Sequence, residues 1–124
     1  MLAMALVSPM QSFRGYGIRE ALADFDVRTN VSAFVAYGGR ENSFKTSGRR
    51  ICRTFERSHT PIPANTPDRK KKQDLFTHEL PTSLQGTRLL SVRELKLREN
   101  LREFIALRVV ARRDQFPWKS RVIN

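Results

Sequence analysis

Positive charge is concentrated in the middle of this 124-residue chain. Between Gly38 and Lys72 there are ten lysines and arginines against three acidic residues, a net charge of +7 out of +11 for the whole chain. The first 37 residues have no net charge, and the last 52 carry +4. Because like charges repel in a compact state, this segment limits how tightly the chain can fold on its own. It indicates a polyanionic partner, and nucleic acid is the commonest.

The chain has the length of one small domain, and we expect residues 1–124 to form one. Hydrophobic residues make up 40% of it, somewhat below the usual apolar fraction, so the core should be small. The predicted fold class is α+β. We expect a small irregular domain with a β-hairpin, a long C-terminal amphipathic helix and extended basic loops.

The hairpin is predicted within residues 18–57, after a short helix. Apolar and polar residues alternate from Phe25 to Tyr37 as in a half-buried strand, whose successive side chains face opposite sides. The Gly38-Gly39 pair predicts a turn, and residues 44–55 a returning strand. A lone hairpin is only marginally stable in water, so it must pack on a helix or on a partner.

Extended segments flank this unit. Residues 1–17 are predicted to form an N-terminal arm. Residues 58–86 are predicted to form an extended basic loop, since four prolines remove backbone donors there. Loops of this length are usually functional or disordered, so we expect this one to be held by something outside the chain.

A long helix is predicted over residues 87–116, followed by a tail over 117–124. Ser91 and Glu94 have the spacing of a capping box at its start. The predicted protein-interface residues are the apolar face of this helix and a tryptophan in the tail, namely Leu97, Leu101, Phe104, Ile105 and Trp118.

Arginines are interleaved with apolar residues between Arg49 and Arg57, four of them in nine residues. On a strand, alternate arginines would share one face with Ile51 and Phe55. Guanidinium groups suit phosphate oxygens and can stack on unpaired bases. The residues predicted to bind RNA are Arg49, Arg50, Arg53, Arg57, Arg69, Lys70, Lys71, Lys72, Arg112 and Arg113.

No catalytic or metal-binding pattern is predicted, so we expect neither an enzyme nor a cofactor nor a small-molecule substrate. Residues 39–46 end in Lys-Thr, like a phosphate-binding loop, but lack the glycine before the lysine, and no helix is expected after them. Cys52, His59 and His78 have the spacing of no common zinc module. The single cysteine excludes an intramolecular disulfide and suits a reducing compartment.

No apolar run approaches the roughly 20 residues that cross a bilayer, so no transmembrane segment is expected. The first 18 residues lack acidic groups and include Arg14, which loosely suits an organellar targeting segment. The expected location is therefore the mitochondrial matrix, with the cytoplasm as the alternative.

Four short segments that contain cations are spread along the chain: Gly48-Arg49-Arg50, Arg69 to Lys72, Arg112-Arg113 and Trp118 to Arg121. Together they resemble the small structural proteins of ribosomes, particularly mitochondrial ones, in which basic extensions thread between rRNA helices. The resemblance implies a structural constituent of a ribosome that binds the rRNA phosphate backbone beside neighbouring proteins. The alternative is a supernumerary, non-catalytic subunit of a large mitochondrial respiratory or ATP synthase complex.

Overall fold

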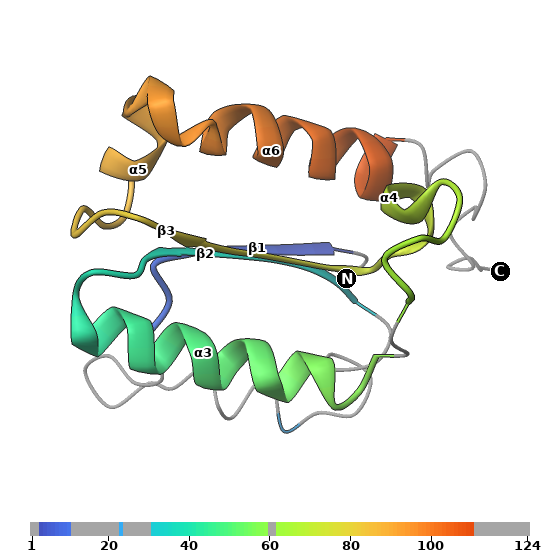
Figure 1. The fold of residues 1–124 in the computed structure, drawn as a ribbon, viewed down its shortest axis with the longest axis horizontal. Coiled ribbons are helices and arrows are strands. Elements are labelled where there is room, and N and C mark those ends of the chain that lie inside the picture. Colours follow the sequence, from blue (N-terminus) through green and yellow to red (C-terminus); the bar gives the residue numbers. More distant parts are fainter. Residues whose placement is uncertain (1–2, 11–22, 24–30, 60–61, 111–124) are drawn as a thin grey trace, which may run out of the picture.

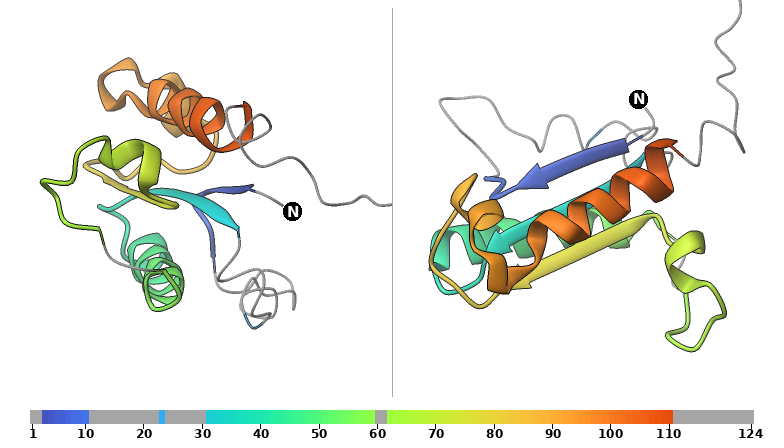
Figure 2. Two further views of the ribbon diagram at one scale, coloured as in Figure 1. Left: turned by 90° about the vertical axis from the view of Figure 1, so that its right-hand side faces the viewer. Right: turned by 90° about the horizontal axis from the view of Figure 1, so that it is seen from above.

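The structure, a computed structural model, describes residues 3–10, 23, 31–59 and 62–110. Its centre is a three-stranded parallel sheet in the order β1 (Ala3–Val7), β2 (Ser32–Gly38) and β3 (Leu75–Leu80). Helix α3 (Asn42–Glu56) covers one face and helix α6 (Leu97–Ile105) the other, which gives three layers (Figure 1 and Figure 2). The expected mixture of helices and strands is confirmed.

Shorter elements complete the described part of the chain. Helix α4 (Arg69–Lys72) immediately precedes β3. Helix α5 (Arg88–Ser91) and the 3₁₀ turn η1 (Arg93–Leu95) lead from β3 into α6. A π-helical turn, η2 (Ala106–Val110), continues α6.

The predicted hairpin is wrong, because both strand pairs are parallel. Every residue of β2 is buried, since this central strand is covered on both faces. A parallel strand in that position is recognised by a continuous apolar run, and Ala33 to Tyr37 is such a run. Even the polar Ser32 is buried, and its hydroxyl donates to Asp74 Oδ1 at 2.8 Å. The predicted helix over 18–25 lies outside the described residues, apart from one position.

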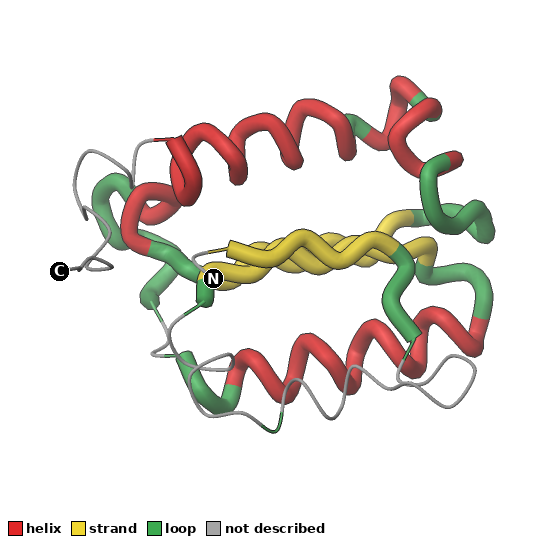
Figure 3. The backbone as a smooth tube through the Cα atoms, turned by 180° about the vertical axis from the view of Figure 1, so that it is seen from behind, coloured by secondary structure: helices red, strands yellow, loops and turns green. Residues whose placement is uncertain are grey.

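The predicted returning strand over 44–55 is a helix. Phe44, Ile51 and Phe55 are spaced by seven and four residues, which places them on one helical face, and Ile51 and Phe55 of this face pack on the sheet. Gly48 lies on the same face, directly against the Tyr37 ring. Figure 3 shows α3 running along the sheet as a continuous helix.

Hydrophobic clusters fill both sides of the sheet. On the α3 side the buried residues are Ala33, Val35, Tyr37, Ile51, Cys52 and Phe55. On the α6 side they are Phe34, Ala36, Phe76, Leu80, Leu89, Leu97 and Phe104. Alternate residues of β2 thus point into different clusters, so this single strand supports both layers.

The chain from 58 to 86 is not the uniform extended loop that we expected, because it contains α4 and β3. Nor is the C-terminal helix continuous from Ser91. Lys96 has a left-handed backbone (φ 56°), and α6 begins after it. The predicted capping box does not form: Ser91 ends α5, and its hydroxyl donates to the Arg88 carbonyl at 2.8 Å. Residues 111–116 lie outside the described residues.

The carboxyl ends of β1 and β2 are tied to the loop after β3. The Gln85 side chain accepts from the Gly38 N–H at 3.0 Å and donates to the Gly38 carbonyl at 2.9 Å. The Ser8 hydroxyl donates to Gln85 Oε1 at 2.7 Å and accepts from the Gly86 N–H at the same distance. Ligands of open parallel sheets commonly bind at this end. Here the polar groups of Ser8, Gly38, Gln85 and Gly86 form hydrogen bonds with one another.

Candidate nucleic-acid interface

The predicted RNA-binding arginines of α3 face away from the sheet. Because the apolar face of α3 packs on β2, the residues between its apolar positions point outward. Arg50, Arg53 and Arg57 are exposed there. In the helix they are separated from Ile51 and Phe55, contrary to the shared strand face that the sequence predicted.

Arg49 has a different role from its neighbours. Its guanidinium donates from Nε to Glu79 Oε1 at 2.8 Å and from Nη2 to Glu79 Oε2 at 3.0 Å. These hydrogen bonds raise the pKa of Arg49 and lower that of Glu79. The Tyr37 hydroxyl donates to the same carboxylate at 3.0 Å, and burial followed by this bond raises the pKa of Tyr37. Arg49 therefore ties α3 to β3.

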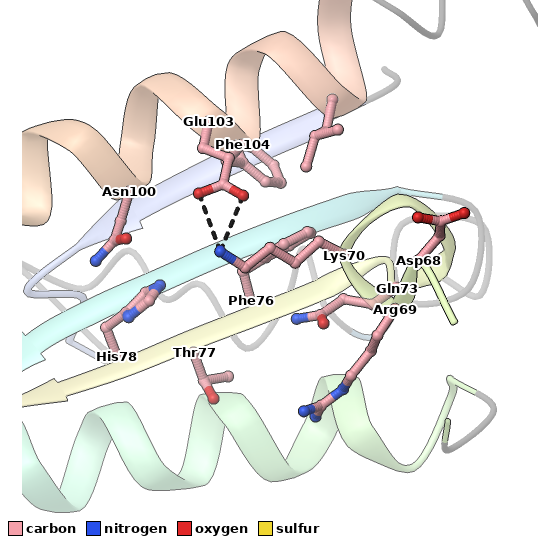
Figure 4. Close-up of a pocket in the computed structure, with 11 residues that line it drawn as sticks. Asp68, Arg69, Lys70, Gln73, Phe76, Thr77, His78, Asn100, Glu103 and Phe104 are labelled. Atoms are coloured by element: carbon pink, nitrogen blue, oxygen red, sulfur yellow. Dashed lines mark hydrogen bonds and ion pairs between the residues drawn. The ribbon is translucent and has the colours of Figure 1, made fainter. Parts of the chain in front are cut away.

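Helix α4 brings a second set of cations to the same end of the molecule. Figure 1 shows α4 and the C-terminal end of α3 at one end of the sheet, opposite α5. Arg69 and Lys70 are both exposed. In Figure 4 the Arg69 side chain points away from α6, toward the side of the sheet on which α3 lies. We refer to Arg53, Arg57, Arg69 and Lys70 as the basic end. Lys71 and Lys72 also belong to α4, but their side chains lie outside the description.

A cavity of about 640 Å³ lies beside the basic end, between β3, α4 and α6 (Figure 4). Lys70 crosses it to pair with Glu103 of α6, with Nζ–Oε distances of 3.0 and 3.3 Å. The lining residues come from all three elements and their junctions: Asp68, Arg69, Lys70, Gln73, Phe76, Thr77, His78, Asn100, Glu103, Phe104 and Leu107. The cavity thus combines aromatic, charged and amide groups.

His78 lines this cavity from β3, on the strand face shared with Phe76 and Leu80. Its ring lies 5.1 Å from that of Phe34, at a tilt of 40°. Burial, and then the nearby Lys70, lowers the pKa of His78, whereas Glu103 acts in the opposite direction. The lowered pKa favours the neutral imidazole, in which one nitrogen is a donor and the other an acceptor.

The N-terminus of α3 differs from the sequence prediction for residues 39–46. A helix begins within these residues, at Asn42, and continues beyond them, although none was expected. However, Glu41 caps it, and its carboxylate accepts from the Phe44 N–H at 3.0 Å. An acidic group already occupies the helix end, where a bound phosphate would have to compete with it.

The three soft metal-ligand candidates remain apart. Cys52 is buried in the α3 cluster, and burial raises its thiol pKa to about 11. The His59 ring nitrogen Nδ1 lies 2.8 Å from the Phe55 carbonyl, and His78 lies on the other side of the sheet. Among the described residues, no group of three histidine, cysteine, aspartate or glutamate side chains could hold a metal ion.

The predicted protein-interface residues pack largely within the chain. Leu97 and Phe104 are buried against the sheet, and Leu101 packs beside them. Ile105, by contrast, has 43% of its surface exposed. The remaining predicted residues, Trp118 with the cations Arg112 and Arg113, lie outside the described residues.

Sequence reasoning found the basic residues but missed the cavity beside them. His78, Asn100 and Glu103 carry no local signal of a shared site, since strand β3 and helix α6 supply them from distant parts of the chain. The alternation of Phe76, His78 and Leu80 would have indicated a strand with one apolar face.

None of the helices that the structure describes combines the length and apolar character needed to cross a membrane. Comparisons of the chain with protein-family models, with curated proteins and with solved structures gave no match.

Proposed function

We propose that this protein is a structural, RNA-binding constituent of a ribonucleoprotein particle, and that its basic end contacts the RNA phosphate backbone. The observation that carries the proposal is the position of Arg53 and Arg57 on the outer face of α3, at the same end of the molecule as the cations of α4. The fold does not require exposed arginines there, since α3 packs on the sheet through its opposite face.

The sequence resemblance favours rRNA of a mitochondrial-type ribosome as the RNA, which would place the protein in the mitochondrial matrix. Guanidinium groups bind phosphate oxygens through paired N–H donors, and each contact releases counterions from the RNA. Most contacts would then be to the backbone, with limited sequence readout. No catalytic step is part of the proposal.

The experiment compares two triple variants that lose the same charge from opposite ends of the molecule. The first changes the basic end: Arg53→Gln, Arg57→Gln and Arg69→Gln. The control changes exposed arginines of α5, η1 and α6: Arg88→Gln, Arg93→Gln and Arg98→Gln. We expect the first to weaken binding to a structured rRNA fragment by about 10- to 100-fold at low salt, and the control by only a few-fold. Equal losses in both variants would contradict the proposed surface.

The alternative, a supernumerary subunit of a respiratory or ATP synthase complex, is favoured by a different observation. Ile105 and Val110, at the end of α6 and in η2, are 43% and 59% exposed, as residues that meet a neighbouring protein can be. Nuclease treatment of native complexes separates the two functions. An RNA-bound constituent is released, whereas a subunit held by protein contacts remains in its complex.

A further inference from the structure

The cavity beside the basic end shares Arg69 and Lys70 with it, but its other lining residues have no part in the phosphate binding proposed above. Its volume of about 640 Å³ falls within the range of pockets that hold small ligands. Arg69 and Lys70 lie at its α4 wall, so an RNA backbone held at the basic end would pass its mouth. Proteins that recognise RNA sequence commonly bind unstacked bases in pockets beside the surface that holds the backbone.

The walls can take up a flat, aromatic base. Phe76 and Phe104 meet edge to face with ring centroids 5.4 Å apart and form an apolar floor. The neutral imidazole of His78 adds a planar group at the side, and histidine is among the residues on which RNA bases stack. Asn100 supplies an amide that both donates and accepts hydrogen bonds.

The charged pair in the cavity presents a donor beside an acceptor. The ammonium of Lys70 lies 3.0 Å from Glu103 Oε1, and Figure 4 shows both groups within the cavity. Their side chains are 68% and 41% exposed, and ion pairs this exposed are held weakly. A ligand with complementary groups can therefore insert between them.

Guanine is the base whose Watson–Crick edge fits this pair best. It has two adjacent donors, N1–H and the N2 amino group, which a carboxylate can accept through its two oxygens. Its O6 is an acceptor next to them, to which an ammonium group can donate a hydrogen bond. Adenine and cytosine have an amino group beside a ring acceptor, and uracil has one N–H, so each leaves a Glu103 oxygen without a base donor.

We propose that the cavity between β3, α4 and α6 binds one unstacked guanine base, with Glu103 accepting from N1–H and N2–H and Lys70 donating to O6. The inference rests on the proposed RNA-binding function for its biological ligand. Free guanosine monophosphate tests it separately, because the base contacts use only Lys70 of the four residues of the basic end.

The first measurement uses the full chain and four hairpin RNAs that differ in one unpaired loop nucleotide. We expect the guanine-containing RNA to bind about tenfold more tightly than the other three, as one bidentate base contact allows. Glu103→Gln should reduce this preference to less than about twofold, because the amide replaces one of the two acceptor oxygens with an NH₂ donor that opposes a base N–H. Glu99→Gln, which removes an equal charge from an exposed position of α6 outside the cavity, should keep the preference.

The second measurement titrates guanosine and adenosine monophosphates separately and follows the His78 ring resonances by NMR. Selective shifts with the guanine nucleotide are expected, and they should be lost in Glu103→Gln while its thermal unfolding midpoint stays near that of Glu99→Gln. Equal affinity for all four RNAs, or equal shifts with both nucleotides, would overturn the guanine site and leave the phosphate-binding surface intact. Guanine-selective shifts without RNA binding would support the site and contradict the proposed function.

Discussion

Replacing Phe104 with alanine is expected to lower the free energy of unfolding by about 3–5 kcal/mol. The side chain is 2% exposed, and its ring lies 5.5 Å from that of Phe34 and 5.4 Å from that of Phe76. Truncation removes apolar contacts and leaves a cavity that the neighbouring β2 and β3 cannot close, because each is fixed by its strand pairing. Urea denaturation followed by circular dichroism measures the change.

Ile105→Ala is the matched control, since Ile105 is the next residue of α6 and is 43% exposed. Its expected cost is below about 1 kcal/mol. Similar costs at the two positions would contradict the packing of α6 on the sheet. If Phe104→Ala had normal stability, the result would instead support the protein-interface role that the sequence predicted for Phe104.

Replacing Gly38 with alanine is expected to destabilise the protein by about 2–3 kcal/mol. An added Cβ would collide with the Leu84 carbonyl oxygen and would lie 2.6 Å from that of Thr82. Both obstacles are backbone atoms, so the loop after β3 must move as a unit. That movement would also disturb the paired hydrogen bonds between Gly38 and Gln85.

Gly39→Ala provides the comparison for this prediction. Its Cβ would meet Cγ of the Glu79 side chain at 2.5 Å, and a partly exposed side chain can rotate away at lower cost. We expect thermal unfolding to show a clearly larger decrease for Gly38→Ala than for Gly39→Ala. The reverse order would mean that the loop after β3 is not held against the end of β2.

The local sequence pattern was enough to locate some elements, but not to tell a helix from a strand or a fully buried strand from a half-buried one. The alternation from Phe25 to Tyr37 predicted a half-buried strand that overlaps β2, whereas the burial of β2 on both faces depends on α3 and α6. The polar residues ahead of Val31 contributed most of that alternation in the sequence. In α3, arginines and apolar residues share every second position from Arg49 to Arg57, which favoured a strand and obscured the helical spacing of the apolar residues.

Part of the basic middle of the chain packs within the fold. Helix α3 keeps its arginines apart from the core and packs through Ile51 and Phe55. One of the cations, Arg49, is bound by Glu79 within the fold. The charge of this segment did predict that its exposed surface is basic. Surface charge follows from which residues are present, whereas the contacts between elements depend on the fold.

The candidate cavity was beyond sequence reasoning for a geometric reason. Lys70 and Glu103 become neighbours only when α4 and α6 meet at the same end of β3. The spacing of these two residues along the chain does not predict that contact. The break before α6, at the left-handed Lys96, was missed for a related reason, since Ser91 and Glu94 match a capping box in sequence without forming one.

The salt dependence of binding to a structured rRNA fragment decides whether the basic end works by neutralising phosphate. With about four phosphate contacts, affinity should fall roughly 50- to 150-fold between 50 and 200 mM monovalent salt. The slope of log affinity against log salt should be shallower by about 2–3 in the triple variant of Arg53, Arg57 and Arg69. An affinity that stays constant over this range of salt would contradict RNA binding through these residues.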